Sequence, residues 1–200
     1  MSLTNNLGQN ITLATNILQK TYENLNLLFV EMDRVGEEEG FMSLTPKFLR
    51  WKSESNTNGW LISNFIKLYQ LQENSSVPHL SDLRTGDIYC VEVSLNNGME
   101  DYPEITLARF TYDYDFWTKM PSVSDHWIFF YPFRDENNFK IQEKNGIWTT
   151  TPYAKSRKKY WGIQQGIAQV IPLLQVTSPE TIRSEIFKVL SELPESDPTV

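Results

Sequence analysis

Two carboxylates, those of Asp113 and Asp115, stand among five aromatic rings in the stretch FTYDYDFWTK, residues 110–119. If the stretch is a strand, both carboxylates lie on one face about 7 Å apart, because alternate side chains share a face. Such a pair can hold a hard cation or act as an acid and a base. The same alternation is typical of a strand that buries rings on one side and exposes acids on the other. We predict the structural strand, and we keep Asp113 and Asp115 as candidate catalytic residues.

Two further candidates for chemistry are Glu104 and His126. Glu104 precedes the same predicted strand, and with Asp113 and Asp115 it would form the acidic set of a metal-dependent enzyme. His126 follows Asp125 directly, but neighbouring residues on a strand point apart, so we predict that it opens a strand. The sequence has no HExxH, GxSxG, GxGxxG or P-loop pattern. We therefore expect no metal and no cofactor, and we assign no reaction.

One basic run stands out in this acidic chain. It mixes cations with rings, the combination that holds single-stranded nucleic acid or a nucleotide. Its candidate binding residues are Lys155, Arg157, Lys158, Lys159, Tyr160 and Trp161. The other interpretation is a solvated loop or the start of a helix. The net charge of −7 argues against nucleic acid as the partner, because phosphate binding depends on a surplus of Lys and Arg.

The composition is that of a soluble globular protein, with 40% hydrophobic, 22% charged and 13% aromatic residues. The one cysteine, Cys90, lies in an apolar run and is interpreted as buried and inert. The N-terminus has no basic segment followed by an apolar core, and no stretch reaches the ~18 apolar residues of a membrane span. We expect a cytoplasmic protein that does not bind membranes.

Residues 3–35 carry the clearest helical pattern. Apolar side chains recur at steps of three and four, at Leu7, Ile11, Ala14, Leu18, Leu25, Leu28, Met32 and Val35. A helix of this length is about 50 Å long, whereas a 200-residue globule is only roughly 40 Å across. The helix must then overhang, break near residues 24–26, or pair with another chain, and near-heptad spacing suits pairing. The interpretation that we favour is a helix that packs across a sheet of its own domain. The acidic run Glu37–Glu39 and Gly40 mark the end of the helix, and Gly36 could supply the left-handed residue past its last turn.

The middle of the chain shows short β-type segments separated by turns. Residues 60–71 fit either a strand or a helix, with a hairpin turn at Asn58-Gly59 favouring the strand. The other predicted strands are 89–95 (half-buried), 105–117, 126–133 and a hairpin over 138–151 closed at Asn145-Gly146. Residues 162–176 have some helical periodicity, and 178–193 form a helix capped by Ser178.

The predicted fold is α+β: a long N-terminal helix, an antiparallel sheet of five or six strands across 45–150, and one or two C-terminal helices on one sheet face. We divide the chain into a helix, 1–40, that belongs to the same domain or forms a dimerisation arm, and an α+β part, 41–200, counted together as one domain. The leading hypothesis is a non-enzymatic protein-binding or regulatory protein that uses an aromatic-rich, acidic surface and binds a protein partner or itself. The alternatives are a metal-dependent enzyme acting on a phosphate or nucleotide, and a module that binds a small ligand.

Overall fold

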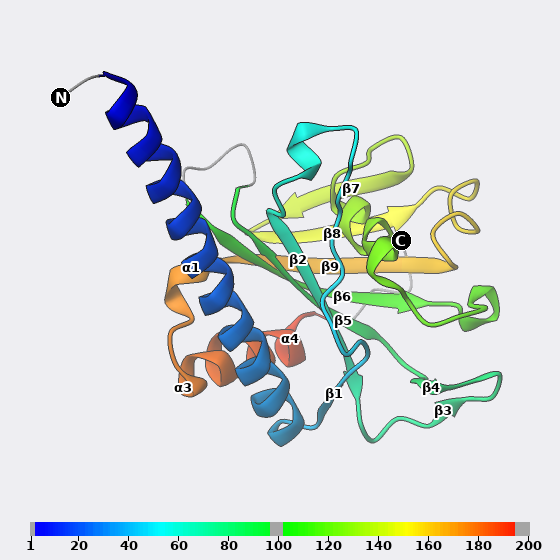
Figure 1. Cartoon of the computed structure of the whole chain (residues 1–200). Helices are drawn as coiled ribbons and strands as arrows, with labels where there is room; N and C mark the ends of the chain where they lie inside the picture. Colours follow the sequence, from blue (N-terminus) through cyan, green and yellow to red (C-terminus); the bar gives the residue numbers. More distant parts are fainter. Residues whose placement is uncertain (1–2, 97–101, 195–200) are drawn as a thin grey trace.

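The computed structural model describes residues 3–96 and 102–194, with side chains from residue 6 onward. A seven-stranded antiparallel sheet forms its centre, in the order β1-β2-β5-β6-β9-β8-β7 (Figure 1). These strands are β1 (Phe41–Ser43), β2 (Asn64–Leu71), β5 (Ile88–Ser94), β6 (Glu104–Tyr112), β7 (Phe139–Lys144), β8 (Ile147–Pro152) and β9 (Ile163–Pro172). A small separate hairpin joins β3 (Ser76–Val77) to β4 (Leu80–Arg84). The predicted α+β class is confirmed, with seven strands in the main sheet in place of five or six.

Helices cover one face of the sheet, and loops with short helical turns cover the other (Figure 1). The helical face carries α1 (Leu3–Glu38), α3 (Pro179–Ile182), the π-helical turn η6 (Arg183–Phe187) and α4 (Lys188–Glu192). The remaining short elements are η1 (Thr57–Gly59), η2 (Tyr114–Phe116), η3 (Val123–His126), α2 (Trp127–Phe130), η4 (Tyr131–Phe133) and η5 (Leu173–Gln175). We call the sheet and the elements that cover it the body.

Covering both faces gives the sheet two hydrophobic cores. On β5, Tyr89, Val91 and Val93 face the helices. Ile88 and Cys90 enter the opposite core, so every residue of this strand is buried. The expectation of a half-buried strand at 89–95 is therefore wrong, because the loops of the second layer exclude water from the face that we expected to be wet.

The C-terminal half of α1 packs on the body through Leu25, Phe29, Met32 and Val35, all buried. The helix is unbroken at 24–26 and runs to Glu38, so it ends in the acidic run as predicted, and Gly40 follows it at a positive φ of 83°. The left-handed role predicted for Gly36 is wrong. Gly36 lies within the helix, where a Cβ would stand 2.7 Å from the ring of Phe187. Its lack of a side chain lets the C-terminal helix approach closely.

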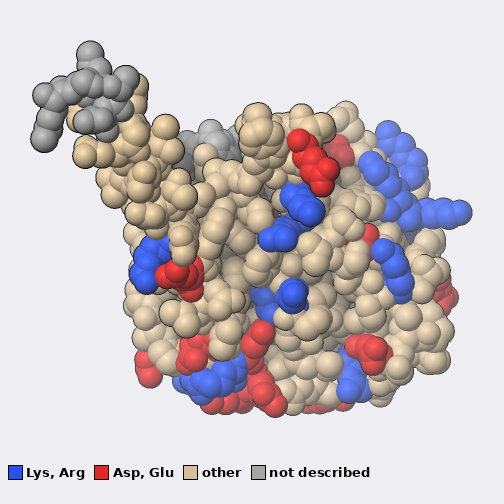
Figure 2. All heavy atoms as spheres, viewed as in Figure 1, with Lys and Arg blue, Asp and Glu red and all other residues tan. Residues whose placement is uncertain are grey.

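The N-terminal half of α1 extends past the body into solvent (Figures 1 and 2). Leu7, Ile11, Leu13 and Ile17 are 58–70% exposed. Contact with the body begins around Leu18, which is half-buried, and Tyr22, whose hydroxyl donates to the carbonyl of Ile62 at 2.8 Å. The favoured interpretation, a helix that packs across its own sheet along its whole length, is therefore wrong, and the helix overhangs the body instead.

Two segments adopt other structures than their patterns predicted. Residues 126–133 form short helical turns and not a strand, since Ser122 and Asp125 make a capping box that starts η3. Residues 163–172 form strand β9 where the periodicity suggested a helix. A strand buried on both faces shows apolar residues at both parities, which resembles a helical stripe.

Other boundaries were predicted more closely. Residues 60–71 resolve as a strand, β2, although Asn58-Gly59 belongs to the turn η1 and not to a hairpin. The hairpin at Asn145-Gly146 is confirmed, with both residues at positive φ of 56° and 78°. Ser178 caps the C-terminal helix as expected.

Candidate functional site

A pocket of about 370 Å³ opens between α1 and residues 46–50. Apolar side chains form much of its wall, and charged side chains come from α1, from β2 and from the 46–50 segment. The lining residues are Asn26, Phe29, Val30, Asp33, Pro46, Lys47, Phe48, Arg50, Lys67 and Val123. Its volume lies within the usual range for small-molecule sites, and such sites combine an apolar wall with a few polar groups in this way.

An ion pair between Lys67 and Asp33 lies at the inner end of this pocket. Lys67 and Tyr69 share one face of β2 because they are two residues apart, and that face looks toward α1. The Lys67 ammonium donates to Asp33 Oδ2 at 2.8 Å, and the Tyr69 hydroxyl donates to Asp33 Oδ1 at 2.9 Å. The Lys67 side chain is only 2% exposed, whereas that of Asp33 is 38% exposed. Burial, with the nearby Asp33 carboxylate, raises the pKa of Tyr69 well above its usual range, so Tyr69 stays a neutral donor.

The Lys67 ammonium is not fully satisfied by the described residues. Besides the bond to Asp33 it makes one hydrogen bond among the described residues, a long one of 3.4 Å to the carbonyl of Thr45. An ammonium has three N–H donors, so one of them has no acceptor among the described residues. The Thr45 hydroxyl is also buried without a hydrogen-bond partner there. Buried polar groups are normally paired, so such shortfalls indicate a place where water or a ligand binds.

Two more cations border the pocket. The Arg50 guanidinium stands 5.8 Å from the centre of the Phe48 ring, and the Phe48 ring lies 5.4 Å from that of Phe29. Neither Arg50 nor Lys47 makes a side-chain hydrogen bond or ion pair with a described residue. With Lys67 and Asp33 they give the pocket a formal net charge of +2 in a chain of −7. Figure 2 shows basic side chains in the middle of this face, beside α1.

The predicted catalytic residues do not come together. The strand ends at Tyr112, so Asp113 and Asp115 lie in a turn and not on a strand face, and Asp113 accepts from the backbone N–H of Asp115 at 3.2 Å. Glu104 begins β6, a strand of nine residues, and so lies at its opposite end, about 27 Å away. Over 3–96 and 102–194, no three His, Cys, Asp or Glu side chains form a group that could hold a metal ion.

His126 lies in η3 and not at the entry of a strand. Its Nδ1 is 3.3 Å from the carbonyl oxygen of Ser124, and its ring packs near Phe130. Burial lowers the pKa of His126, partly offset by that carbonyl and by Asp125. The neighbouring Asp125 carboxylate is engaged by Ser122 and by Lys119, so it does not orient the imidazole.

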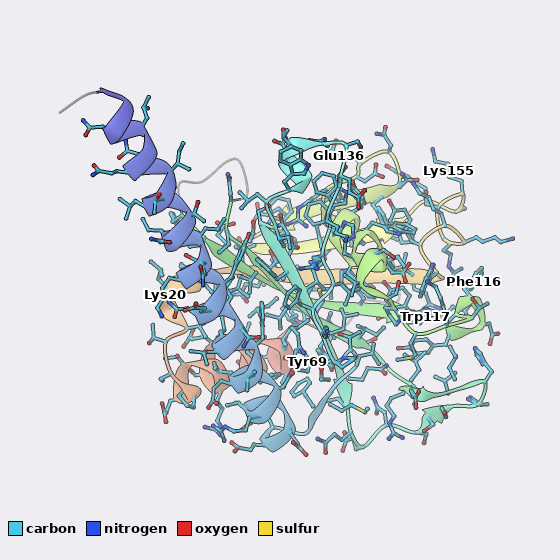
Figure 3. All side chains as sticks on the ribbon, viewed as in Figure 1. Lys20, Tyr69, Phe116, Trp117, Glu136 and Lys155 are labelled. Carbon is cyan, nitrogen blue, oxygen red and sulfur yellow. The ribbon has the colours of Figure 1, made fainter. Side chains whose placement is uncertain are left out.

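The predicted basic run forms an exposed loop at the edge of the molecule opposite α1, where Figure 3 labels Lys155. Its four cations, Lys155, Arg157, Lys158 and Lys159, are exposed. Tyr160 is buried and donates to Asp135 at 3.1 Å, which leaves its ring out of reach of a base. Trp161, at a positive φ of 54°, packs edge-on against Trp117 at 5.1 Å. Binding at this loop stays a prediction.

The sequence reasoning missed Asp33, Lys67 and Arg50. A signal existed for Lys67, which is the one charged residue in the strand NFIKLYQL. Burial of an unpaired charge in a strand costs free energy, so such a residue indicates that a group of opposite charge lies next to it. Asp33 could not be named as that partner, because it is 34 residues away and on a different element.

No family model, curated protein or solved structure matches this chain. Among the described helices, none has the length and apolar content to cross a membrane. The function must therefore be inferred from the residues and their geometry.

Proposed function

We propose that this chain is a non-enzymatic protein-binding protein whose contact surface is the projecting part of α1, and that its partner is a second copy of the same chain. The main support for this proposal is that Leu7 and Ile11 are 61% and 70% exposed on a helix that continues past the body. We call the row formed by Leu7, Ile11, Ala14 and Leu18 the seam. Helices that expose such a row gain free energy by covering it.

The spacing of the seam supports a helical partner. Its steps of four, three and four residues continue those of Leu25, Leu28, Met32 and Val35, which pack on the body. A row with this spacing fits between the side chains of a second helix that carries the same row. The helix alone would be marginal in water over so short an exposed length, so pairing would also stabilise it.

The charge distribution supports a second copy over a different partner. The first 19 residues contain no Asp, Glu, Lys or Arg, whereas residues 20–38 contain seven. Depletion of charge is typical of the centre of a protein interface. An uncharged surface offers nothing that would select an oppositely charged partner. It also lets two copies of a −7 chain approach through a neutral arm that holds their charged bodies apart.

The geometry favours an antiparallel pair. The seam looks toward the same side as the packed half of α1, because the helix is unbroken and the spacing is continuous. A parallel partner helix over the seam would bring its own body onto α1 of the first copy. An antiparallel partner places the two bodies at opposite ends, and the resulting two-fold contact is self-complementary.

The test is the mass of the intact chain in solution over a concentration series, by light scattering during size exclusion. We expect a species of twice 23.3 kDa. The double variant Leu7→Glu with Ile11→Glu should elute at 23.3 kDa, because it places charges in the seam. Leu27→Glu, at a site 66% exposed on the packed half of α1, is the matched control and should remain dimeric.

Two results would sink the proposal. One is a mass of 23.3 kDa at every concentration for the unaltered chain. The other is retention of the chain by vesicles of neutral phospholipid that the seam variant abolishes, since an amphipathic helix can also lie in a lipid interface.

A further inference from the structure

We propose that the pocket between α1 and residues 46–50 binds a small organic anion: a carboxylate or phosphate group attached to an aromatic or aliphatic body. This inference does not depend on the pairing of α1. The pocket has hydrogen-bonding groups at one end, an apolar wall and a surplus of positive charge. Each of these features restricts the chemical class of the ligand.

The polar end selects an anion. Asp33 already accepts from Lys67 and from Tyr69, so its negative charge is largely compensated inside the pocket. The cations of Arg50 and Lys47 have no such partner among the described residues, although the chain carries 25 acidic residues. A guanidinium without a partner presents two parallel N–H groups that match a carboxylate or a phosphate. The third N–H of Lys67, which lines the pocket, adds a donor without an acceptor among the described residues.

The apolar wall requires that the anion carry a body. Phe29, Phe48, Pro46 and Val123 line the pocket together with Val30. The Phe48 ring, under the guanidinium of Arg50, offers a flat surface to a second ring. A bare inorganic anion would leave this wall in contact with water, so burial of an apolar group adds to the affinity. The volume of about 370 Å³ admits a small ligand.

Competing sites on the surface lack this combination. The exposed basic loop, Lys155 to Lys159, has charge but no enclosing apolar wall, since Tyr160 is buried below it. The hollow lined by Glu39, Arg183 and Glu192 holds an arginine that is already paired with Glu38 and Glu39. The pocket beside α1 therefore carries the inference.

Isothermal titration of the full chain with phenyl phosphate tests it, with inorganic phosphate and benzyl alcohol as the two half-ligands. We expect saturable one-to-one binding of phenyl phosphate, and affinities at least tenfold lower for each half-ligand. Arg50→Gln should lower the affinity for phenyl phosphate at least tenfold, because it removes a bidentate charge-assisted contact. Lys47→Gln should lower this affinity less. Lys140→Gln, which changes an exposed lysine on β7, should leave the affinity unchanged.

Three results would overturn the inference. The first is no saturable heat with phenyl phosphate. The second is equal affinity for phenyl phosphate and inorganic phosphate, which would mean that the apolar wall does not contact the ligand. The third is that the Arg50→Gln variant binds phenyl phosphate with unchanged affinity. This result counts if the variant has the same thermal midpoint as the unaltered chain, which shows that it is folded. Lys47→Gln, at an exposed site, repeats the test should Arg50→Gln fold poorly.

Discussion

The two halves of α1 have one apolar pattern and two different surroundings. Met32 and Val35 are fully buried against the sheet and the C-terminal helices, whereas Leu7 and Ile11, on the same side of the same helix, are 61% and 70% exposed. Seven charged residues accompany the packed half, and none accompanies the projecting half. The spacing specifies that a helix has an apolar face, but it does not specify what covers that face. The difference in charge is the feature that sets the two halves apart.

The largest change in the free energy of unfolding should come from shortening a side chain in the packed half of α1. Met32→Ala removes a fully buried side chain from the contact with the body and should lower the free energy of unfolding by about 2–5 kcal/mol. Ile11→Ala, measured at a concentration below that of any association, should change it by less than about 0.5 kcal/mol. Chemical denaturation of both variants measures the contrast. Equal losses would mean that the projecting half packs on the body after all.

The second effect concerns Gly36. An alanine there would place a methyl group 2.7 Å from the ring of Phe187, which is held between Phe41 and Tyr69 at 5.0 and 5.3 Å. We expect Gly36→Ala to lower the free energy of unfolding by about 1–3 kcal/mol, because the ring cannot move aside. Denaturant titration would show this, and a gain in stability would contradict the close packing of α1 on the C-terminal helix.

The third effect is a dependence on pH in the packed half. The folded state raises the pKa of Tyr69 above its unfolded value of about 10. The contribution of neutral Tyr69 to the free energy of unfolding is therefore complete below pH ~10 and is lost as the pH rises above that value. Tyr69→Phe should cost about 1–2 kcal/mol at pH 7, through the lost hydrogen bond to Asp33. The difference in unfolding free energy between the two proteins, followed by urea titration, should stay constant up to pH ~10 and shrink as the pH rises above it. A constant difference would show that Tyr69 does not titrate in this way.

The smallest effect belongs to the projecting half. Gly8 lies in the helix with nothing within 4 Å of the position of a Cβ. Gly8→Ala should stabilise this end of the helix by about 0.5–1 kcal/mol, since alanine loses less backbone entropy. Hydrogen exchange of the amides around residues 8–14 should slow, with the global midpoint unchanged. Faster exchange would mean that glycine is required there.

Much of the fold was readable from local patterns. The steps of three and four in residues 3–35, the Asn145-Gly146 turn and the Ser178 cap depend on neighbours in sequence, and the structure confirms all three. The two errors have different sources. Residues 126–133 are as apolar as a strand, but the local capping box of Ser122 and Asp125 begins a helical turn there. Strand β9 contributes side chains to both cores, so its apolar residues do not alternate, and only the tertiary structure decides this.

The candidate site was less readable than the fold. Asp113 lies in the predicted strand 105–117 and Glu104 directly precedes it. In the structure Glu104 begins β6 and Asp113 follows its last residue, so proximity in sequence gave a false cluster. The contact of Asp33 with Lys67 joins α1 to β2 across 34 residues. Only the packing of the helix on the sheet creates it, so no local pattern could assign it.

Cross-linking at the seam tests the central claim most directly, and the chain is well suited to it. Its one cysteine, Cys90, is buried, and burial raises the pKa of that thiol well above its usual range, so the native chain should not react with a maleimide. Ile11→Cys introduces a thiol on the seam near the middle of the projecting half. Asn16→Cys introduces one on the opposite side of the same helix, where the residue is also exposed to solvent.

With a short flexible bismaleimide, the account predicts a covalent dimer of twice 23.3 kDa from Ile11→Cys and monomer from Asn16→Cys. Equal yields at the two positions, or no dimer from Ile11→Cys, would contradict the claim that the seam faces a second copy.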